Sequence, residues 1–513
     1  MIRPIASFVT AAAVAAATTA GATPELTPMG PPFGVLLHTV GPQDNPAVAV
    51  ADDGRFFVAW QGPSSGSVGN AVHLRLFDAD GTPLGDELEA IVSSISPLGT
   101  TPLATLTDGG AALTWRSGNP SQVVLQRFSR DGQPLGAAAR VSRNEAVSHF
   151  DAAVATDGVG RLVVAWSAYD YNAYGTTGYD RIYARRLTEG GQPLEPPRIL
   201  EQVDTFPADG GFGDASETGV ATLDRTGFVV AWSDYRFDGV TAQSRVVVDR
   251  RDEDGESIDR ELLGGGDALN NFADAPAVSS DRQGRFTIAW DGYSGCTDYG
   301  YATRGAGCEA GYQGARNARR DRDGAALATV DPANVFDNRS QGQSAVSVAT
   351  HGDFVLAWTG GESPDGAGAA APDGDGDGVF VRAFDCAGRA GQELQVNTYT
   401  TGAQNQPAVS VGADGTVVVA WTDAGLDGDG AGIFARRYRL SPSCPLCGDA
   451  DDDGAVRASD ALTILRAAVG SDLCEPARCD TNDDGDVAAT DASAVLRYAV
   501  GLRVVVACPL PEV

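Results

Sequence analysis

The sequence predicts a mainly β protein: a seven-bladed β-propeller followed by a small α-helical C-terminal domain. The first observation is a short apolar strand ending in Ala-Trp, which recurs along the chain. Clear copies lie at Phe56–Trp60, Leu162–Trp166, Phe228–Trp232, Phe286–Trp290, Phe354–Trp358 and Thr416–Trp421, and a weaker copy lies at Ala111–Trp115. The second observation is that all seven tryptophans of the chain occupy this one position, 51 to 68 residues apart. Long repeats with several strands each, lengthened by loop insertions, indicate a propeller with one blade per repeat.

Each repeat is predicted to contain four strands. The first is short and rich in small residues, as in Pro46–Val50, which suits the crowded centre of a ring. A tight Asp-Gly turn leads into the tryptophan strand, whose continuous apolar character predicts burial on both faces. The third strand alternates, as in Ile433–Tyr438, and a more polar fourth strand, as in Glu393–Thr398, ends the unit.

The two ends of the repeat array predict how the ring closes. The seventh repeat stops after its third strand, at about Leu440, while Gly34–Val40 resembles a fourth strand placed ahead of the first repeat. We therefore expect Gly34–Val40 to complete the seventh blade and to remove the open edge of the ring. The propeller is expected to span residues 23–443.

Three long insertions lie between the second and third strands of their repeats, at Tyr169–Asp180, Asp291–Gly314 and Ser363–Asp377. They are expected to emerge on one face, and binding loops often gather on one face of a rigid scaffold. We take that face as the candidate binding surface. The Asp-Gly strings at residues 373–377 and 427–429 have two interpretations, either flexible loops or weak Ca²⁺ sites.

The N-terminus indicates export. Residues 1–22 have the features of a secretory signal peptide: Arg3, an Ala/Val-rich run and small residues at Ala20–Ala22. The apolar run is too short to span a bilayer, and no later stretch reaches about 20 apolar residues. We expect a protein that is secreted or held at the cell surface, without a membrane span. The Ala-Trp repeats with Asp-Gly loops also resemble repeats of exported bacterial proteins.

The formal net charge of −31 argues against nucleic acid or an anionic membrane as a partner. It is compatible with cation binding, although an acidic surface that keeps the protein in solution explains most of it. All 37 basic residues are Arg. The absence of Lys excludes Schiff-base chemistry.

Eight cysteines in an exported chain indicate disulfides. Cys296 and Cys308 share one insertion and form a reasonable local pair, while Cys386 lies in a predicted turn. The other five are near the C-terminus, at Cys444, Cys447, Cys474, Cys479 and Cys508. An alternative interpretation of Cys444 and Cys447 is a zinc knuckle or a redox pair, and the sequence leaves the remaining pairing open.

Two acidic loops, Asp449–Asp460 and Asp480–Asp491, predict calcium sites. Both place oxygen-bearing side chains at loop positions one, three, five and twelve, and Gly at position six. Ca²⁺ takes six to eight oxygen ligands, and the Gly permits the sharp bend of such a loop. Two ions are therefore expected. The predicted ligands are Asp449, Asp451, Asp453, Asp460 and the carbonyl of Ala455 in the first loop, and Asp480, Asn482, Asp484, Asp491 and the carbonyl of Asp486 in the second.

Each loop leads into a predicted amphipathic helix, at Ala461–Val469 with Leu462 and Leu465, and at Ala492–Val500 with Val495, Leu496 and Ala499. Two loop–helix copies with Asp at position twelve resemble a type I dockerin, over residues 444–513. The resemblance implies Ca²⁺-dependent binding to a cohesin module through the helix starts. It implies partner-binding roles for Ala458, Ser459, Ala489 and Thr490, where the family usually carries hydroxyl pairs, and for Arg466 and Arg497.

Catalytic motifs give little support for an enzyme. The four His lie on different repeats without a metal-binding spacing, and Ser280–Gly284 does not meet the sialidase box. Paired carboxylates remain open, because their pairing is spatial. The leading hypothesis is an exported, non-catalytic binding and anchoring protein whose propeller face takes a polysaccharide or glycan. The alternative is a polysaccharide-degrading glycoside hydrolase, which two buried carboxylates at the mouth of the central channel would favour.

Overall fold

The computed structural model describes residues 23–64, 69–91, 102–118, 120–143, 147–157, 160–171, 178–205, 212–223, 227–237, 242–264, 273–294, 312–328, 341–361, 376–426, 428–500, 502, 504 and 506–510. The predicted signal peptide lies outside these residues. So do Cys296, Cys308 and most of the three long insertions, together with Asp373, Asp375 and Asp427 of the Asp-Gly strings.

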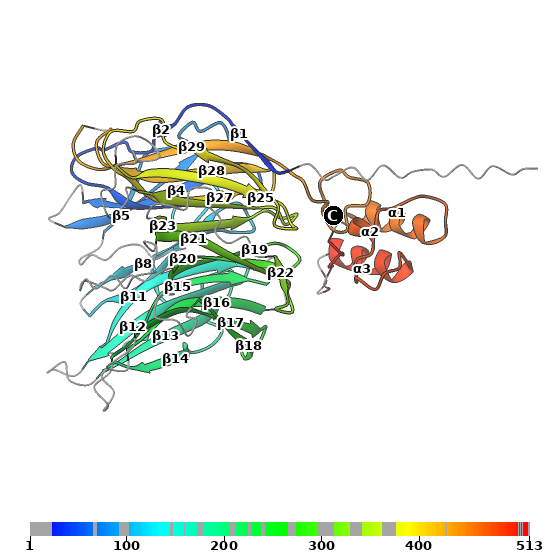
Figure 1. Ribbon diagram of the computed structural model, residues 1–513, viewed down its shortest axis with the longest axis horizontal. Helices are drawn as coiled ribbons and strands as arrows, with labels where there is room; N and C mark the ends of the chain where they lie inside the picture. The colour runs from blue at the N-terminus through cyan, green and yellow to red at the C-terminus, as the bar shows by residue number, and fades with distance from the viewer. Residues whose placement is uncertain are drawn as a thin grey trace, which may run out of the picture.

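Seven antiparallel sheets follow one another along the chain and form the blades of a propeller (Figure 1). Blade one contains β3 (Asp44–Val50), β4 (Phe56–Pro63), β5 (Asn70–Phe77) and β6 (Leu88–Ile91). Blade two contains β7 (Leu103–Thr105), β8 (Ala111–Ser117), β9 (Gln122–Phe128) and β10 (Ala139–Arg140). Blade three contains β11 (Ser148–Thr156), β12 (Leu162–Tyr171), β13 (Gly178–Leu187) and β14 (Arg198–Asp204). Blade four contains β15 (Phe212–Thr222), β16 (Gly227–Phe237), β17 (Ala242–Asp252) and β18 (Ser257–Leu263).

The last three blades complete the ring. Blade five contains β19 (Ala273–Ser280), β20 (Phe286–Ser294), β21 (Tyr312–Arg320) and β22 (Ala326–Ala328). Blade six contains β23 (Gln341–Val348), β24 (Phe354–Gly360), β25 (Gly378–Phe384) and β26 (Ala390–Gln395). Blade seven contains β27 (Gln404–Val411), β28 (Thr416–Asp423) and β29 (Gly432–Ser441), and the N-terminal strands β1 (Glu25–Pro28) and β2 (Phe33–Gly34) join it.

The N-terminal closure of blade seven is confirmed, but its predicted position was wrong. β1 and β2 both pair antiparallel with β29, and the Val35 N–H then donates to the Ile433 carbonyl at 2.9 Å. Residues beyond Val35 run as loop, with the Leu37 side chain 48% exposed. The strand escaped prediction because prolines interrupt it; Pro lacks the ladder donor and is tolerated only on such an edge.

The seven tryptophans lie on the second strand of each blade, as predicted, and all are buried. They fill the layers between neighbouring blades rather than a single central core. Trp166 of blade three, for example, packs with Ala112 and Val123 of blade two. Because each layer needs two blades, the core is continuous only when the ring is closed.

The first strands of all seven blades line the central channel. Their Ala, Val, Ser and Thr side chains surround a cavity of about 260 Å³. Hydroxyl groups connect neighbouring strands here: Thr222 Oγ1 donates to the Thr156 carbonyl at 2.6 Å, and Val50 N–H donates to Ser410 Oγ at 3.0 Å. The channel wall is therefore made of small and mostly apolar side chains.

The two faces of the propeller differ. Hairpins between first and second strands, and between third and fourth strands, lie on one face, which we call the hairpin face. Connections between second and third strands lie on the opposite face, which we call the loop face. At the hairpin face the channel opens into a cavity of about 410 Å³, crossed by an ion pair of 3.4 Å between Arg282 and Asp52.

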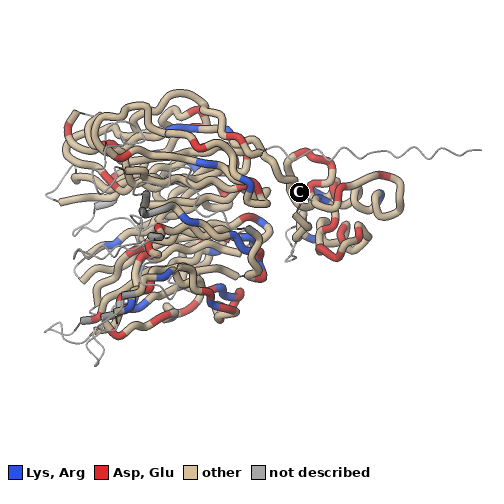
Figure 2. The backbone as a smooth tube through the Cα atoms, in the orientation of Figure 1, with Lys and Arg blue, Asp and Glu red and all other residues tan. Residues whose placement is uncertain are grey.

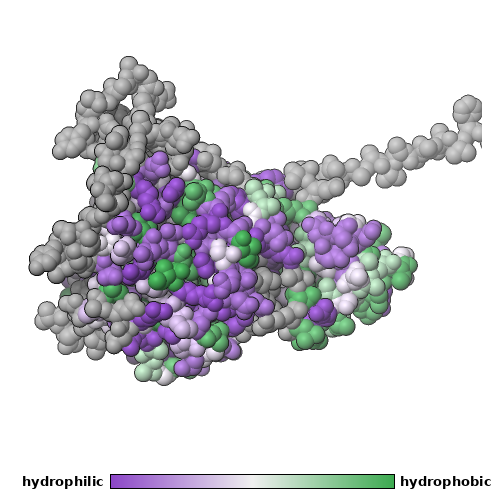
Figure 3. Space-filling view, turned by 90° about the horizontal axis from the view of Figure 1, so that it is seen from below, coloured by the Kyte–Doolittle hydropathy of each residue, from purple (hydrophilic) through white to green (hydrophobic). Residues whose placement is uncertain are grey.

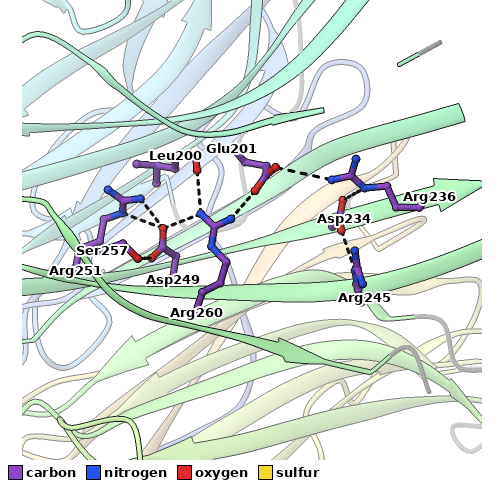
Figure 4. Close-up of polar contacts among 9 residues, drawn as sticks. All are labelled: Leu200, Glu201, Asp234, Arg236, Arg245, Asp249, Arg251, Ser257 and Arg260. Atoms are coloured by element: carbon purple, nitrogen blue, oxygen red, sulfur yellow. Dashed lines mark hydrogen bonds and ion pairs between the residues drawn. The ribbon is translucent and has the colours of Figure 1, made fainter. Parts of the chain in front are cut away.

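Arginines connect neighbouring blades at the outer rim. Asp249 of blade four is fully buried and accepts hydrogen bonds from Arg251 at 2.6 and 3.0 Å and from Ser257 at 2.6 Å (Figure 4). Arg260 joins this cluster at 3.2 Å and also reaches blade three, where it donates to Glu201 at 2.6 Å and to the Leu200 carbonyl at 2.9 Å. The guanidinium thus ties the two blades together.

Replacement of Asp249 by Ala is expected to destabilise the propeller by about 3–5 kcal/mol, because buried Arg251 loses its counter-charge. Asp259→Ala is the matched control: Asp259 also pairs with an arginine, Arg250, but its side chain is 49% exposed, and the expected cost is within about 1 kcal/mol. Urea denaturation midpoints measure both. Equal losses for the two variants would contradict the assigned role.

The C-terminal module follows β29 and lies beside the propeller (Figure 1). It contains α1 (Ala458–Ala468), α2 (Pro476–Cys479) and α3 (Ala489–Ala499). The two longer helices begin three residues before their predicted starts, because the last loop residues, Asp460 and Asp491, already lie in the first helical turn. Within the described part of the chain, the helices are all too short or too polar to cross a membrane.

Candidate functional site

The first acidic loop is held in shape by its own carboxylates. Asp449 accepts hydrogen bonds from the N–H groups of Asp453 at 3.1 Å and Gly454 at 2.9 Å. Asp460, fully buried, accepts from the N–H groups of Ala450 at 2.8 Å and Arg457 at 2.7 Å. Positions one and twelve therefore turn the loop back on itself around one centre.

The second loop repeats these four hydrogen bonds. Asp480 accepts from the N–H groups of Asp484 at 3.2 Å and Gly485 at 2.9 Å. Asp491 accepts from the N–H groups of Thr481 at 2.8 Å and Ala488 at 2.9 Å. The glycines at position six have positive φ, 83° for Gly454 and 91° for Gly485. Because the same backbone arrangement occurs in two copies, it follows from the shared spacing of Asp and Gly residues in the two loops.

The structure brings three of the five predicted ligands of the first loop together. Carboxylate oxygens of Asp449, Asp451 and Asp453 lie within 4.8 Å of one another, so the cluster can hold a metal ion. Burial raises the pKa of Asp449, and the nearby charge of Asp460 raises it further. A divalent cation would offset both effects, and carboxylate oxygens are the ligands Ca²⁺ prefers. The residues present therefore fit a calcium ion. Figure 2 shows acidic residues along these loops.

Three polar residues of this module were missed at the sequence level. Arg457 forms an ion pair with Asp453, Arg478 of α2 donates to Asp452 at 2.6 Å, and the Thr481 hydroxyl donates to Asp491 at 3.2 Å. Arg457 lies four residues after Asp453, a spacing that could have suggested its pair. Arg478 reaches the first loop from a distant part of the sequence, so no local pattern indicates it.

A second acidic site lies at the loop face of blade five. Asp274, at the start of β19, stands directly opposite Asp291, which follows Trp290 on β20. Directly opposed strand residues have Cβ atoms about 4.5–5.5 Å apart. Burial raises the pKa of Asp291 to about 6, and burial together with the charges of Glu217 and Asp291 raises that of Asp274 to about 7. Asp291 also accepts from the N–H groups of Gln343 at 2.5 Å and Ser344 at 3.0 Å, which joins blade five to blade six.

Residues 447–499 match the family model of the dockerin type I domain. The C-terminal module is dockerin-like. This match agrees with the resemblance seen in the sequence, and it leaves the propeller outside its range. No curated protein matches the chain.

Solved structures resemble the propeller only distantly. They include a protein of unknown function from Dyadobacter fermentans (11% identity, TM-score 0.38, 82% of this chain and 99% of that chain), a puromycin hydrolase mutant (16%, 0.42, 74% and 50%) and the GH93 α-L-arabinofuranosidase of Fusarium graminearum (11%, 0.38, 80% and 98%). This chain thus spans half the length of the puromycin hydrolase. At TM-scores below 0.5, nothing about activity follows for this chain.

The helices of the dockerin-like module bury only part of the apolar residues that mark their predicted amphipathic pattern. Ala461 and Ile464 of α1 pack against Ala492 and Val495 of α3. Val495 of the predicted pattern is thus buried, whereas Leu462 and Leu465 on α1 and Leu496 on α3 are 42–50% exposed. Ala461 and Ala492 allow the helices to approach closely, and the larger leucine side chains lie on the outward side.

The outward side chains form an apolar surface on the dockerin-like module, away from the propeller (Figure 3). The predicted partner-binding residues are all exposed beside it: Ala458, Ser459 and Arg466 on α1, and Ala489, Thr490 and Arg497 on α3. We call this surface, with Leu462, Leu465, Val469, Leu496 and Val500, the helix surface. Exposed apolar surface bordered by polar residues is typical of an interaction site.

Three disulfides confirm the oxidised chemistry predicted for the cysteines. Cys447–Cys508 joins the two ends of the dockerin-like module, Cys474–Cys479 closes a short loop, and Cys386–Cys444 connects the module to blade six. The zinc-knuckle or redox-pair alternative for Cys444 and Cys447 is wrong, because each has a different partner. The predicted Cys296–Cys308 pair lies outside the described residues.

Proposed function

We propose that the protein is an exported, non-catalytic binding and anchoring protein. In this proposal residues 1–22 are the signal peptide, residues 23–443 the propeller and residues 444–513 the module that docks onto a cohesin-type partner. The observation that carries the proposal is the duplicated loop–helix unit, whose two copies share one hydrogen-bond pattern and expose matching residues. In this arrangement the C-terminal module attaches the protein to its partner, and the propeller carries a separate binding surface.

Each loop is proposed to hold one Ca²⁺ ion. The ligands are those predicted: side chains at positions one, three, five and twelve and the carbonyl at position seven. Calcium supplies the positive charge that the clustered carboxylates lack. The chain's own contribution is to orient the helices, because the residue at position twelve is fixed in the first turn of α1 or α3. Calcium binding therefore fixes the orientation of α1 and α3, and so of the helix surface, without direct contact between the ion and the partner.

The positions of the hairpin face and the loop face support separate roles, attachment for the first and ligand binding for the second. The chain leaves blade seven through β29, whose end lies on the hairpin face, so the docking module is attached to that face. The loop face points the other way and stays accessible when the module is docked. A polysaccharide or glycan is the ligand class proposed for the loop face.

A type I cohesin titration tests the docking surface. Replacement of Leu465, Arg466, Leu496 and Arg497 by Ala is expected to weaken binding at least about 100-fold, because both helix copies lose an apolar anchor and an arginine. Leu473→Ala is the matched control: Leu473 is fully exposed but lies between the helices, and binding should stay within about twofold. Calorimetry with and without Ca²⁺ measures both. Unchanged affinity of the fourfold variant would contradict the assigned surface.

A glycoside hydrolase is the second candidate function, and the Asp274–Asp291 pair favours it. Two carboxyl groups with separate protonation at near-neutral pH are the requirement for acid and base roles in such hydrolysis. The small and apolar channel wall favours binding alone. A hydrolysis assay on a polysaccharide panel separates the two: turnover that disappears in Asp274→Asn and Asp291→Asn would establish the enzyme, and turnover retained by both would exclude this pair.

The Asp274–Asp291 pair also predicts a pH dependence of stability. The folded-state pKa of Asp274, about 7, lies above the reference value of 3.8, so the stability it contributes is present at acidic pH and is lost as the pH rises from about 4 to about 7. Asp274→Asn should flatten this profile and raise the thermal midpoint at pH 7.5. Asp323→Asn, on an exposed hairpin of the same blade, serves as the control. A wild-type midpoint that rises over this pH range, with no difference in Asp274→Asn, would contradict the prediction.

A further inference from the structure

The junction between the propeller and the dockerin-like module is very short. β29 ends at Ser441, and the disulfide that closes the module begins at Cys447, so only residues 442–446 connect the two. Pro442 and Pro445 fix the φ angle at two of these positions, which stiffens the connection further. A flexible leash is therefore absent from this part of the chain.

The junction is anchored to blade six, although the chain leaves from blade seven. Cys444 forms its disulfide with Cys386, in the hairpin between β25 and β26. The Ser443 N–H donates to Asp353 at 2.7 Å, and the Ser443 hydroxyl donates to the other oxygen of the same carboxylate at 2.9 Å. Asp353 is fully buried, in the hairpin between β23 and β24. Both hairpins of blade six on the hairpin face thus hold the junction.

The number of cysteines leads independently to the same connection. Five cysteines follow Ser441, and an odd number cannot be paired within the module alone. The propeller offers Cys386 outside the insertion that holds Cys296 and Cys308. Among the described residues no cysteine is free. A bridge from the module to Cys386 therefore satisfies the count.

We propose that the junction is a mechanical clamp, which transfers tension on the dockerin-like module into blade six and keeps it off the closing strands of the ring. Without the clamp, tension would act on Ser441, the last residue of β29. Ser441 pairs with Glu25, the first residue of the closing strand β1. A pull at that end would separate β1 from β29 one residue pair after another, which needs far less force than separating all pairs at once.

With the clamp, the same tension enters the disulfide and the two hairpins of blade six. The closing strands of blade seven then carry little of it. The mechanical role rests on the proposed tethering, because only a tethered protein is pulled against its anchor. The bonds that form the clamp do not depend on tethering. A failure to bind cohesin would leave the clamp in place, so the two proposals fail separately.

Single-molecule force spectroscopy tests the clamp on the mature chain. One handle is attached through an unnatural amino acid at position 194, which is exposed in blade three, and the other at the C-terminus. We expect the Cys386→Ser/Cys444→Ser variant to begin unfolding at less than half the force of the wild type. Its fully extended length should also be greater by about 200 Å, because 58 residues at about 3.5 Å each are no longer bypassed.

Cys474→Ser/Cys479→Ser is the matched control, since its bridge lies inside the loop that Cys447–Cys508 closes; force and length should both match the wild type. Equal first unfolding forces for the clamp variant and the wild type would overturn the proposal. A second measurement, on the wild-type sequence, tests the clamp in case the Cys386→Ser/Cys444→Ser variant does not fold. With a protease site inserted after Ser441, the cut wild-type chain should stay one species on a non-reducing gel and become two with dithiothreitol, and separation without reduction would overturn the clamp.

Discussion

Removal of calcium with EGTA is expected to unfold the dockerin-like module while the propeller stays folded. A module of fewer than about 70 residues has too small a core to be stable alone, and here α1 and α3 bury few large side chains against each other. Each ion that binds only the folded form adds about 4 kcal/mol at a 1,000-fold excess over its Kd. Loss of two ions therefore removes most of the module's stability. The helical circular dichroism signal should fall, and readdition of Ca²⁺ should restore it.

Variants identify which groups are responsible. Asp460→Ala and Asp491→Ala together should reproduce the effect of EGTA at saturating Ca²⁺, because they remove the buried carboxylates that close both loops. Asp472→Ala, an exposed acidic residue between the helices, is the matched control and should respond to EGTA as the wild type does. A module that keeps its helical signal in EGTA would contradict the assigned role of calcium.

Deletion of residues 23–35 is expected to destabilise the propeller by at least about 5 kcal/mol. The deletion removes buried Leu26 and Val35 and all pairing of β1 and β2 with β29. Two apolar side chains at about 1.5–3 kcal/mol each, with several ladder hydrogen bonds at about 1 kcal/mol each, account for a loss of that size. The exposed edge of β29 should also promote aggregation. Urea denaturation and light scattering measure the two effects.

Point substitutions separate the closing segment from an ordinary tail. Val35→Ala removes a fully buried side chain and is expected to cost about 2 kcal/mol, because the remaining layer between blades one and seven cannot collapse around the gap. Val40→Ala changes a residue that is 75% exposed and should be neutral within about 0.5 kcal/mol. A larger loss of stability for Val40→Ala than for Val35→Ala would show that residues 36–40 close the ring.

The parts of the fold that were predictable depend on local patterns. The tryptophan strands are continuous apolar runs bounded by Asp-Gly turns, so each one is recognisable by itself, and their number gives the number of blades. The acidic loops are equally local, since twelve consecutive residues supply the loop and its bend. In both cases the residues that determine the structure are neighbours in the sequence.

The parts that were missed depend on contacts between distant residues. The amphipathic pattern marks exposed Leu465 and buried Val495 alike, because a buried face and a docking face have similar compositions. The partner of Cys444 lies in a blade six hairpin that no spacing indicates. The Asp274–Asp291 pair depends on a register shift in β19, where Ala275 adopts a φ of 48° without a glycine to signal it.

The central claim is that each of the two acidic loops holds one Ca²⁺ ion. Native mass spectrometry of the mature chain tests this claim most directly, because it counts the bound ions. We predict two Ca²⁺ ions per chain for the wild type, one for the Asp480→Ala/Asp491→Ala variant and none when Asp449 and Asp460 are replaced as well. A wild-type chain that binds no Ca²⁺ at millimolar concentration, or that keeps two ions in the fourfold variant, would contradict it.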